Sequence, residues 1–129
     1  MNKILVEVSV GELLDKISIL EIKQEKIKDP EKLKFISDEH SVLKDQLDQN
    51  VKSNNNIESL FQSLKEINAK LWVIEDDKRL CEKDKDFGEK FIKLSRDVHF
   101  LNDDRAKIKL EINNHTGSVI KEIKEYTSY

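Results

Sequence analysis

The sequence contains few of the residues that break helices or build covalent frameworks. Its 129 residues include one Cys, one Pro, three Gly and one Trp. A single Cys excludes a disulfide or a four-thiolate zinc site within the chain. No apolar run approaches the roughly 20 residues that span a bilayer, and residues 1–10 lack the apolar stretch of a secretory signal. We therefore expect a cytoplasmic protein that does not enter a membrane.

The charges are abundant but nearly balanced. Lys and Arg total 23 against 26 Asp and Glu, which leaves a net charge of -3. Without a basic surplus, neither a nucleic acid nor an anionic membrane is expected as a partner. Abundant Glu, Lys, Leu and Ile with little Gly or Pro is typical of long helices. At this length we predict a single helical domain over residues 1–129.

Local signals mark where the first two helices begin. The apolar, β-branched run at residues 4–8 suits one strand or an extended arm. Ser9 and Glu12 then stand three residues apart, as in a capping box, so a helix is predicted to start there. Asp29 and Pro30 suit an N-cap and a first helical position, so a second helix follows at once.

Two further helices follow polar connections. The Asn-rich stretch at residues 50–56 is predicted to be a loop, with Asn55 capping the third helix. A second break falls at residues 83–88, where Asp86 and Glu89 repeat the capping spacing. Residues 113–117 contain Asn and Gly, which favour the end of the fourth helix.

The apolar pattern predicts how these helices pack. Apolar side chains recur at alternating steps of three and four residues, typical of one buried face on each helix. Short connections join antiparallel neighbours. We predict an all-α fold of two antiparallel helical hairpins in a four-helix, bundle-like arrangement, or with the second hairpin left as a stalk. Residues 118–129 suit a short helix or a strand beside residues 4–8.

Four polar residues interrupt the apolar faces, and each needs a partner if buried. We expect Gln24 to fix the register of the first hairpin, His40 to bond a neighbour, and Lys78 to extend toward solvent.

Arg105 is the fourth and lies in the middle of its helix. A guanidinium there requires a carboxylate or a bound anion. Glu21 and Glu75 are the candidate internal partners.

The only Trp lies among charged residues. On a helix, Trp72, Glu75, Asp76 and Arg79 share one side, and folding the hairpin brings Arg96 close to them. One interpretation is a cleft wall with an aromatic plate and charges of both signs, suited to a phosphorylated or sugar-like ligand. The other is a lattice of exposed salt bridges with the Trp on its rim.

The candidate ligand-binding residues are those that crowd the Trp or face it from the fourth helix: Trp72, Glu75, Asp76, Arg79, Arg96, Asn102 and Arg105. If the site were catalytic, Glu75 or Asp76 would be the acid or base. The three His residues lack metal-ligand spacing, and no Gly-rich phosphate loop is present. We therefore predict no metal and no cofactor.

Three motifs together resemble a small bacterial family of unknown function. They are residues 4–23, which contain VSVGELLDKI, residues 71–79, LWVIEDDKR, and residues 91–109, which contain NDDRA. Members of that family occur in marine and other proteobacteria, some with glycosyltransferases or tetratricopeptide repeats. The resemblance covers nearly the whole chain and implies no activity. It places these residues in the family motif: Glu12, Asp15, Lys16, Glu21, Trp72, Glu75, Asp76, Arg79, Asn102, Asp103 and Arg105.

Two functional hypotheses follow. The first is a non-enzymatic helical binding or adaptor domain in a cell-surface glycan pathway, with a protein partner or a second copy of itself. The second is a small-molecule domain or enzyme that binds a phosphorylated or sugar-nucleotide ligand beside Trp72.

Overall fold

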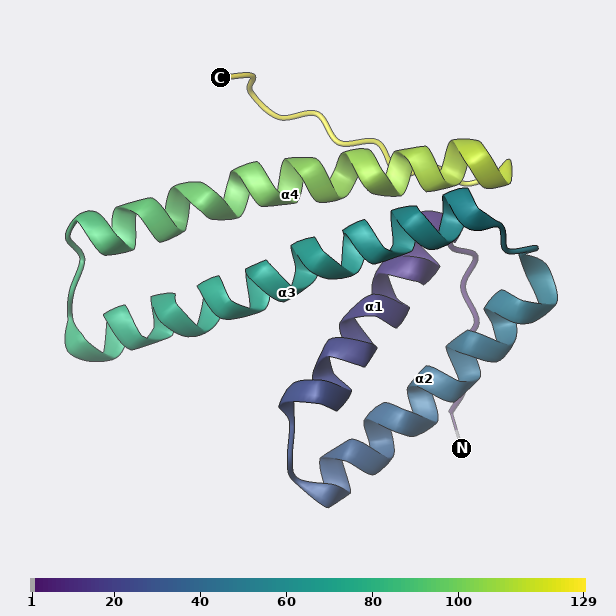
Figure 1. Ribbon diagram of the computed structural model, residues 1–129, viewed down its shortest axis with the longest axis horizontal. Coiled ribbons are helices and arrows are strands. Elements are labelled where there is room, and N and C mark those ends of the chain that lie inside the picture. Colours follow the sequence, from purple (N-terminus) through teal and green to yellow (C-terminus); the bar gives the residue numbers. More distant parts are fainter. Residues whose placement is uncertain (1) are drawn as a thin grey trace.

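The computed structural model, which describes residues 2–129, contains four helices and no strand within those residues. The helices are α1 (Val10–Lys26), α2 (Pro30–Asn50), α3 (Asn55–Asp84) and α4 (Glu89–Thr116). They form two antiparallel hairpins, α1 with α2 and α3 with α4 (Figure 1). The predicted all-α, bundle-like fold is confirmed.

The first two helices begin as their local signals predict. The Ser9 hydroxyl accepts a hydrogen bond from the amide of Glu12 at 3.0 Å. The Asp29 carboxylate accepts from the amide of Glu31 at 3.1 Å, and Pro30 occupies the first turn. Each cap satisfies an amide that has no partner within its helix.

The caps of the other two helices differ from the prediction. Asn54, not Asn55, caps α3, because its side chain accepts from the amide of Ile57 at 2.9 Å. Gly88 is the N-cap of α4 and supplies no side-chain hydrogen bond. Asp86 accepts from the amide of Gly88 at 3.1 Å, so it stabilises the turn before α4 and does not cap the helix.

α1 is the central helix of the fold. It packs against α2, α3 and α4, whereas the backbone of α2 approaches only α1. The main apolar cluster joins α1 to the start of α3 and the end of α4 and consists of Leu14, Ile57, Leu64 and Ile112. Leu47 of α2 packs against this cluster, but no residue of α2 is itself buried. The core therefore lies at one end of the α3–α4 hairpin.

The other end of the α3–α4 hairpin projects beyond α1 (Figure 1). Several of its large apolar side chains are exposed, among them Val73, Leu80, Phe87 and Ile92. The structure thus combines both predicted arrangements, a docked bundle at one end and a two-helix extension at the other.

Gln24 and His40 contact side chains of the neighbouring helix, as expected, whereas Lys78 lies over an aromatic ring instead of extending toward solvent. The Gln24 amide donates to the Ser37 hydroxyl at 3.5 Å, between α1 and α2. His40 Nε2 lies 3.1 Å from the Glu21 carboxylate, across the same pair of helices. Lys78 Nζ lies over the Phe91 ring, 5.8 Å from its centroid, which is a cation–π distance.

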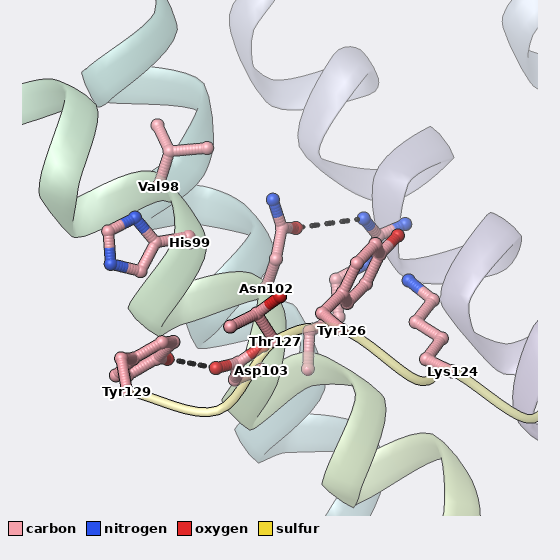
Figure 2. Close-up of a pocket in the computed structure, with 9 residues that line it drawn as sticks. Val98, His99, Asn102, Asp103, Lys124, Tyr126, Thr127 and Tyr129 are labelled. Carbon is pink, nitrogen blue, oxygen red and sulfur yellow. Dashed lines mark hydrogen bonds between the residues drawn. The ribbon is translucent and has the colours of Figure 1, made fainter.

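The two terminal segments have no regular structure. Residues 2–9 form an irregular arm on which Ile4 is 85% exposed. Residues 118–129 are neither the helix nor the strand that the sequence suggests. Side chains hold this segment on α4 instead: Glu122 pairs with Lys109, and the Tyr129 hydroxyl donates to Asp103 (Figure 2). Those contacts replace the backbone pairing that a strand would need.

α1 and α4 are in close contact at Gly11. The Gly11 amide donates to the Asn113 side chain at 2.7 Å, and the amide of Val10 donates to the Ser118 hydroxyl at 3.2 Å. A Cβ atom on Gly11 would lie 2.5 Å from the Lys109 carbonyl oxygen. This crossing therefore requires a residue without a side chain.

We predict that Gly11→Ala lowers the free energy of unfolding by about 1–3 kcal/mol, because the new methyl group forces α1 away from the α4 backbone. Urea unfolding measures the change. Gly88→Ala is the matched control, since its Cβ would meet only the Asp86 carboxylate oxygen, at 3.3 Å. An equal loss in both variants would contradict the close-approach explanation.

Candidate functional site

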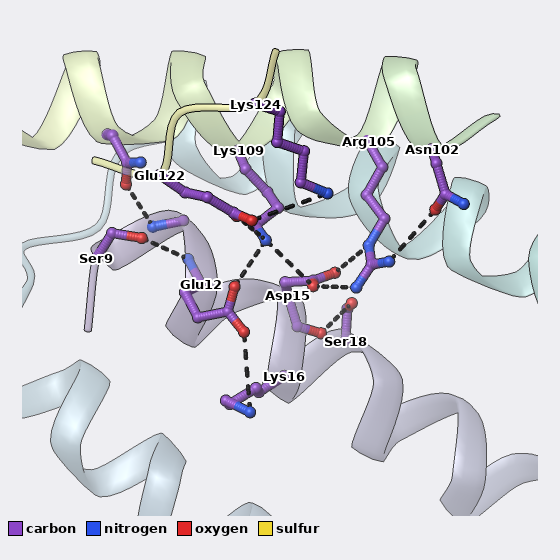
Figure 3. A network of polar contacts seen from close by, with 12 residues as sticks. Ser9, Glu12, Asp15, Lys16, Ser18, Asn102, Arg105, Lys109, Glu122 and Lys124 are labelled. Atoms are coloured by element: carbon purple, nitrogen blue, oxygen red, sulfur yellow. Dashed lines mark hydrogen bonds and ion pairs between the residues drawn. The ribbon is translucent and has the colours of Figure 1, made fainter. Parts of the chain in front are cut away.

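A buried carboxylate ties three helices together. Asp15 of α1 has a side chain only 2% exposed. It accepts from Arg105 Nε at 3.0 Å and also from Arg105 Nη2, so this α4 guanidinium binds it through two nitrogens (Figure 3). The Asn68 amide on α3 donates to Asp15 at 2.8 Å and to the Ser18 hydroxyl at 2.8 Å. Bidentate, charge-assisted pairs of this kind are strong and fix geometry.

Lys109 extends this network toward the C-terminal segment. Its side chain is 8% exposed, and Nζ lies 2.7 Å from a Glu12 oxygen and 2.8 Å from a Glu122 oxygen. It is also 3.7 Å from an Asp15 oxygen. Three carboxylates therefore surround two cations, and the cluster nearly neutralises itself.

The network shifts the protonation equilibria of its members. The hydrogen bond with Asp15 raises the pKa of Arg105. Burial opposes the charge on Lys109, but hydrogen bonds with Glu12 and Glu122 outweigh it and raise the pKa. The hydrogen bond with Lys109 lowers the pKa of Glu122. Every shift favours the charged form, as expected of mutually paired groups.

Arg105 is paired with a carboxylate within the chain, but both predicted partners, Glu21 and Glu75, were wrong. The guanidinium pairs with Asp15, whereas Glu21 pairs with His40 and Lys65, and Glu75 makes no ion pair among the described residues. The apolar pattern did not indicate that Asp15 is buried, because Asp15 lies beside the apolar stripe of α1 and not on it. A second seam was visible in the sequence: Gly11, Asp15, Ser18 and Ile22 recur at helical spacing, and all four are buried. Sequence reasoning also missed Asn68 and Lys109.

A pocket of about 420 Å³ opens beside this network, between α1, α3 and α4. Ile19 and Ile22 of α1 and Leu71 of α3 supply its apolar lining. Five of the seven predicted ligand-binding residues line it, namely Trp72, Glu75, Asp76, Arg79 and Arg105. We call this the Trp72 pocket.

The charged residues of the Trp72 pocket do not form the alternative salt-bridge lattice. Within residues 2–129, Glu75, Asp76 and Arg79 make neither an ion pair nor a side-chain hydrogen bond, although Glu75 and Arg79 are one helical turn apart. All three are exposed, and Trp72 beside them is half-buried. The rim therefore presents carboxylate acceptors and a guanidinium donor next to an aromatic face.

Asn102 and Arg96 lie elsewhere. Asn102 lines a second pocket of about 640 Å³ between α4 and the C-terminal segment, with His99, Tyr126 and Tyr129 (Figure 2). Arg105 lines both pockets, and its Nη1 donates to Asn102 at 3.5 Å. Arg96 is exposed on α4 and is among the lining residues of neither pocket.

The described residues show no alternative centre for metal or thiol chemistry. Among residues 2–129, no three His, Cys, Asp or Glu side chains are grouped so that they could hold a metal ion. Cys81 is buried in α3. In that same part of the chain, none of the helices combines the length and the hydropathy needed to cross a bilayer.

Comparison with known proteins places the chain in a family. A model described as a family of unknown function, DUF6165, matches residues 4–129. The chain belongs to this family. No curated protein and no solved structure matches it. The resemblance to a family of unknown function over nearly the whole chain is thus confirmed, while its bacterial distribution and its association with glycosyltransferases stay predictions.

For this DUF6165 chain, Arg105→Ala is expected to lower the free energy of unfolding by about 3–5 kcal/mol, because it leaves Asp15 buried without its partner. Urea unfolding measures the loss. Arg79→Ala is the matched control: it removes an equally large cation that is exposed and unpaired, so stability should stay within about 0.5 kcal/mol of the original. Equal effects in the two variants would contradict a structural role for the Asp15 pair.

A second prediction concerns acid. The pKa of Glu122 is lower in the folded chain than its usual 4.5, so its ionised form stabilises the fold above that value. This contribution is lost as the pH falls through the folded pKa. Glu122→Gln should therefore be less stable than the original at neutral pH and lose less stability on acidification. Thermal melts across pH test this, with the exposed Glu125→Gln as control. If Glu122→Gln and Glu125→Gln showed the same dependence of stability on pH, the stabilising role of the Glu122 carboxylate would be refuted.

Proposed function

We propose that this chain is a non-enzymatic helical binding domain that holds a sugar ring against Trp72. One observation carries the proposal: in the Trp72 pocket, unpaired carboxylates and a guanidinium flank a half-buried aromatic face above an apolar lining. A sugar ring offers an apolar C–H face to an aromatic plate and hydroxyl groups to such acceptors and donors. The volume of about 420 Å³ falls within the range of small-ligand pockets.

The charges favour a neutral ligand over a phosphorylated one. Arg105 is already bound through two nitrogens to Asp15, which leaves Arg79 as the cation of the rim. The rim also carries two carboxylates, Glu75 and Asp76, so its unpaired charges sum to about -1. A phosphate group would meet net repulsion there, whereas sugar hydroxyls can donate to both carboxylates.

The role of the domain in the cell extends this proposal. The association with glycosyltransferases that the sequence resemblance implies supports a place in a bacterial cell-surface glycan pathway. We propose a cytoplasmic adaptor that acts as one domain over residues 1–129 and presents a glycan or its precursor to a partner protein.

The only Trp of the chain makes the proposal directly testable. Its fluorescence should change on titration with neutral mono- and oligosaccharides, and the ligand should be recovered unchanged. At about a hundredfold over its Kd, the ligand should stabilise the fold by roughly 2.7 kcal/mol in a thermal-shift assay. A response restricted to sugar phosphates or nucleotide sugars, or turnover of the ligand, would contradict the proposal.

Variants locate the binding site. Arg79→Ala and Glu75→Gln should each weaken binding about tenfold while the urea midpoint stays unchanged, because both side chains are exposed and unpaired. Glu66→Gln is the control on the same helix, and Arg96→Ala is the control on α4. Equal weakening by the controls would place the ligand elsewhere.

A further inference from the structure

The α3–α4 hairpin has a second, opposite face that α1 does not cover. A groove of about 610 Å³ runs between the two helices there, lined by the apolar side chains of Ala69, Val73, Ile74, Phe100 and Leu101. None of its lining residues comes from α1 or α2. Its α3 residues alternate along the sequence with those of the Trp72 pocket, which places the two on different sides of the helix.

The apolar surface of this groove is substantial. Val73 is 48% exposed and Phe100 is 41% exposed. Leu80, seven residues after Val73 and therefore on the same face of α3, is also exposed. Contiguous apolar surface of this kind marks an interaction site, since water solvates it poorly.

We infer that this face binds a second copy of the chain, related by a two-fold axis through the groove. Such an interface is self-complementary: where one residue of the first copy contacts a second residue of the other copy, the reverse contact forms as well. The groove offers a matching pair: the Phe100 ring on α4 stays 41% exposed although it packs against Tyr129, and Ala69 on α3 is small. Under the two-fold axis, the Phe100 ring of each copy faces the space beside Ala69 of the other.

The charges that border the groove are complementary in the same way. Lys70 borders it on α3 and Asp97 borders it on α4. Within residues 2–129 Lys70 makes no ion pair, and Asp97 pairs only with Lys93 of its own helix, at 2.7 Å. The same axis brings Lys70 of each copy toward Asp97 of the other, which creates two equivalent ion pairs.

Two hairpins packed groove to groove would form a four-helix bundle of two layers, with a Trp72 pocket on each outer side.

Sedimentation velocity of the full chain over a wide concentration range tests this inference. The expected result is a reversible dimer of about 30 kDa, twice the 15.1 kDa chain mass. Val73→Glu should shift the population to monomer, whereas Phe35→Glu, at an exposed apolar site on α2, should leave the dimer intact. A monomer at every concentration, or equal dimerisation by both variants, would overturn it.

A charge exchange tests the two-fold arrangement itself. Lys70→Asp or Asp97→Lys alone should weaken the dimer about tenfold, because each places like charges opposite one another at two symmetric positions. The double variant should restore the affinity. Failure of that rescue would overturn the proposed symmetry. Ligand titration of Val73→Glu keeps this inference separate from the sugar proposal, since the Trp72 pocket should bind equally well in the monomer.

Discussion

The pairing of Asp15 with Arg105 is the interaction on which the rest of the structure depends. Asp15 is almost fully buried, so its charge is tolerated only where a cation and hydrogen-bond donors meet it at short range. α4 supplies Arg105 and Lys109, and α3 supplies Asn68. These contacts join α1 to both helices of the α3–α4 hairpin. The close contact of Gly11 with the α4 backbone adds a second point at which α1 is held.

The placement of α1 determines what each face of the α3–α4 hairpin presents. On one face, α1 provides Ile19 and Ile22 to the lining of the Trp72 pocket. Because Arg105 is bound to Asp15, the charges free to meet a ligand there are those of the α3 rim. On the other face α1 is absent, so the apolar groove between α3 and α4 stays uncovered. α1 thus helps to form the Trp72 pocket on one face and leaves the apolar groove open on the other.

Local features of the fold could be predicted from the sequence, and long-range ones could not. The helices and the caps at Ser9 and Asp29 depend on residues within one turn, so sequence spacing was enough. The grouping of Trp72 with its charged neighbours also follows from position along one helix. The partner of Arg105 depends on how α1 crosses α4, which no local signal specifies. Likewise, the C-terminal segment is held by scattered side-chain contacts with no sequence period.

Native-state hydrogen exchange of an Asp15→Asn variant is the most direct test that this carboxylate holds α1 in place. We expect the amides of α1 to lose far more protection than those in the projecting half of α3 and α4, because α1 detaches before the hairpin opens. Asp76→Asn, which removes an exposed and unpaired carboxylate from the rim, should leave the pattern unchanged. Unaltered protection of α1 in Asp15→Asn, or a uniform loss along the chain, would show that Asp15 does not hold α1 in place.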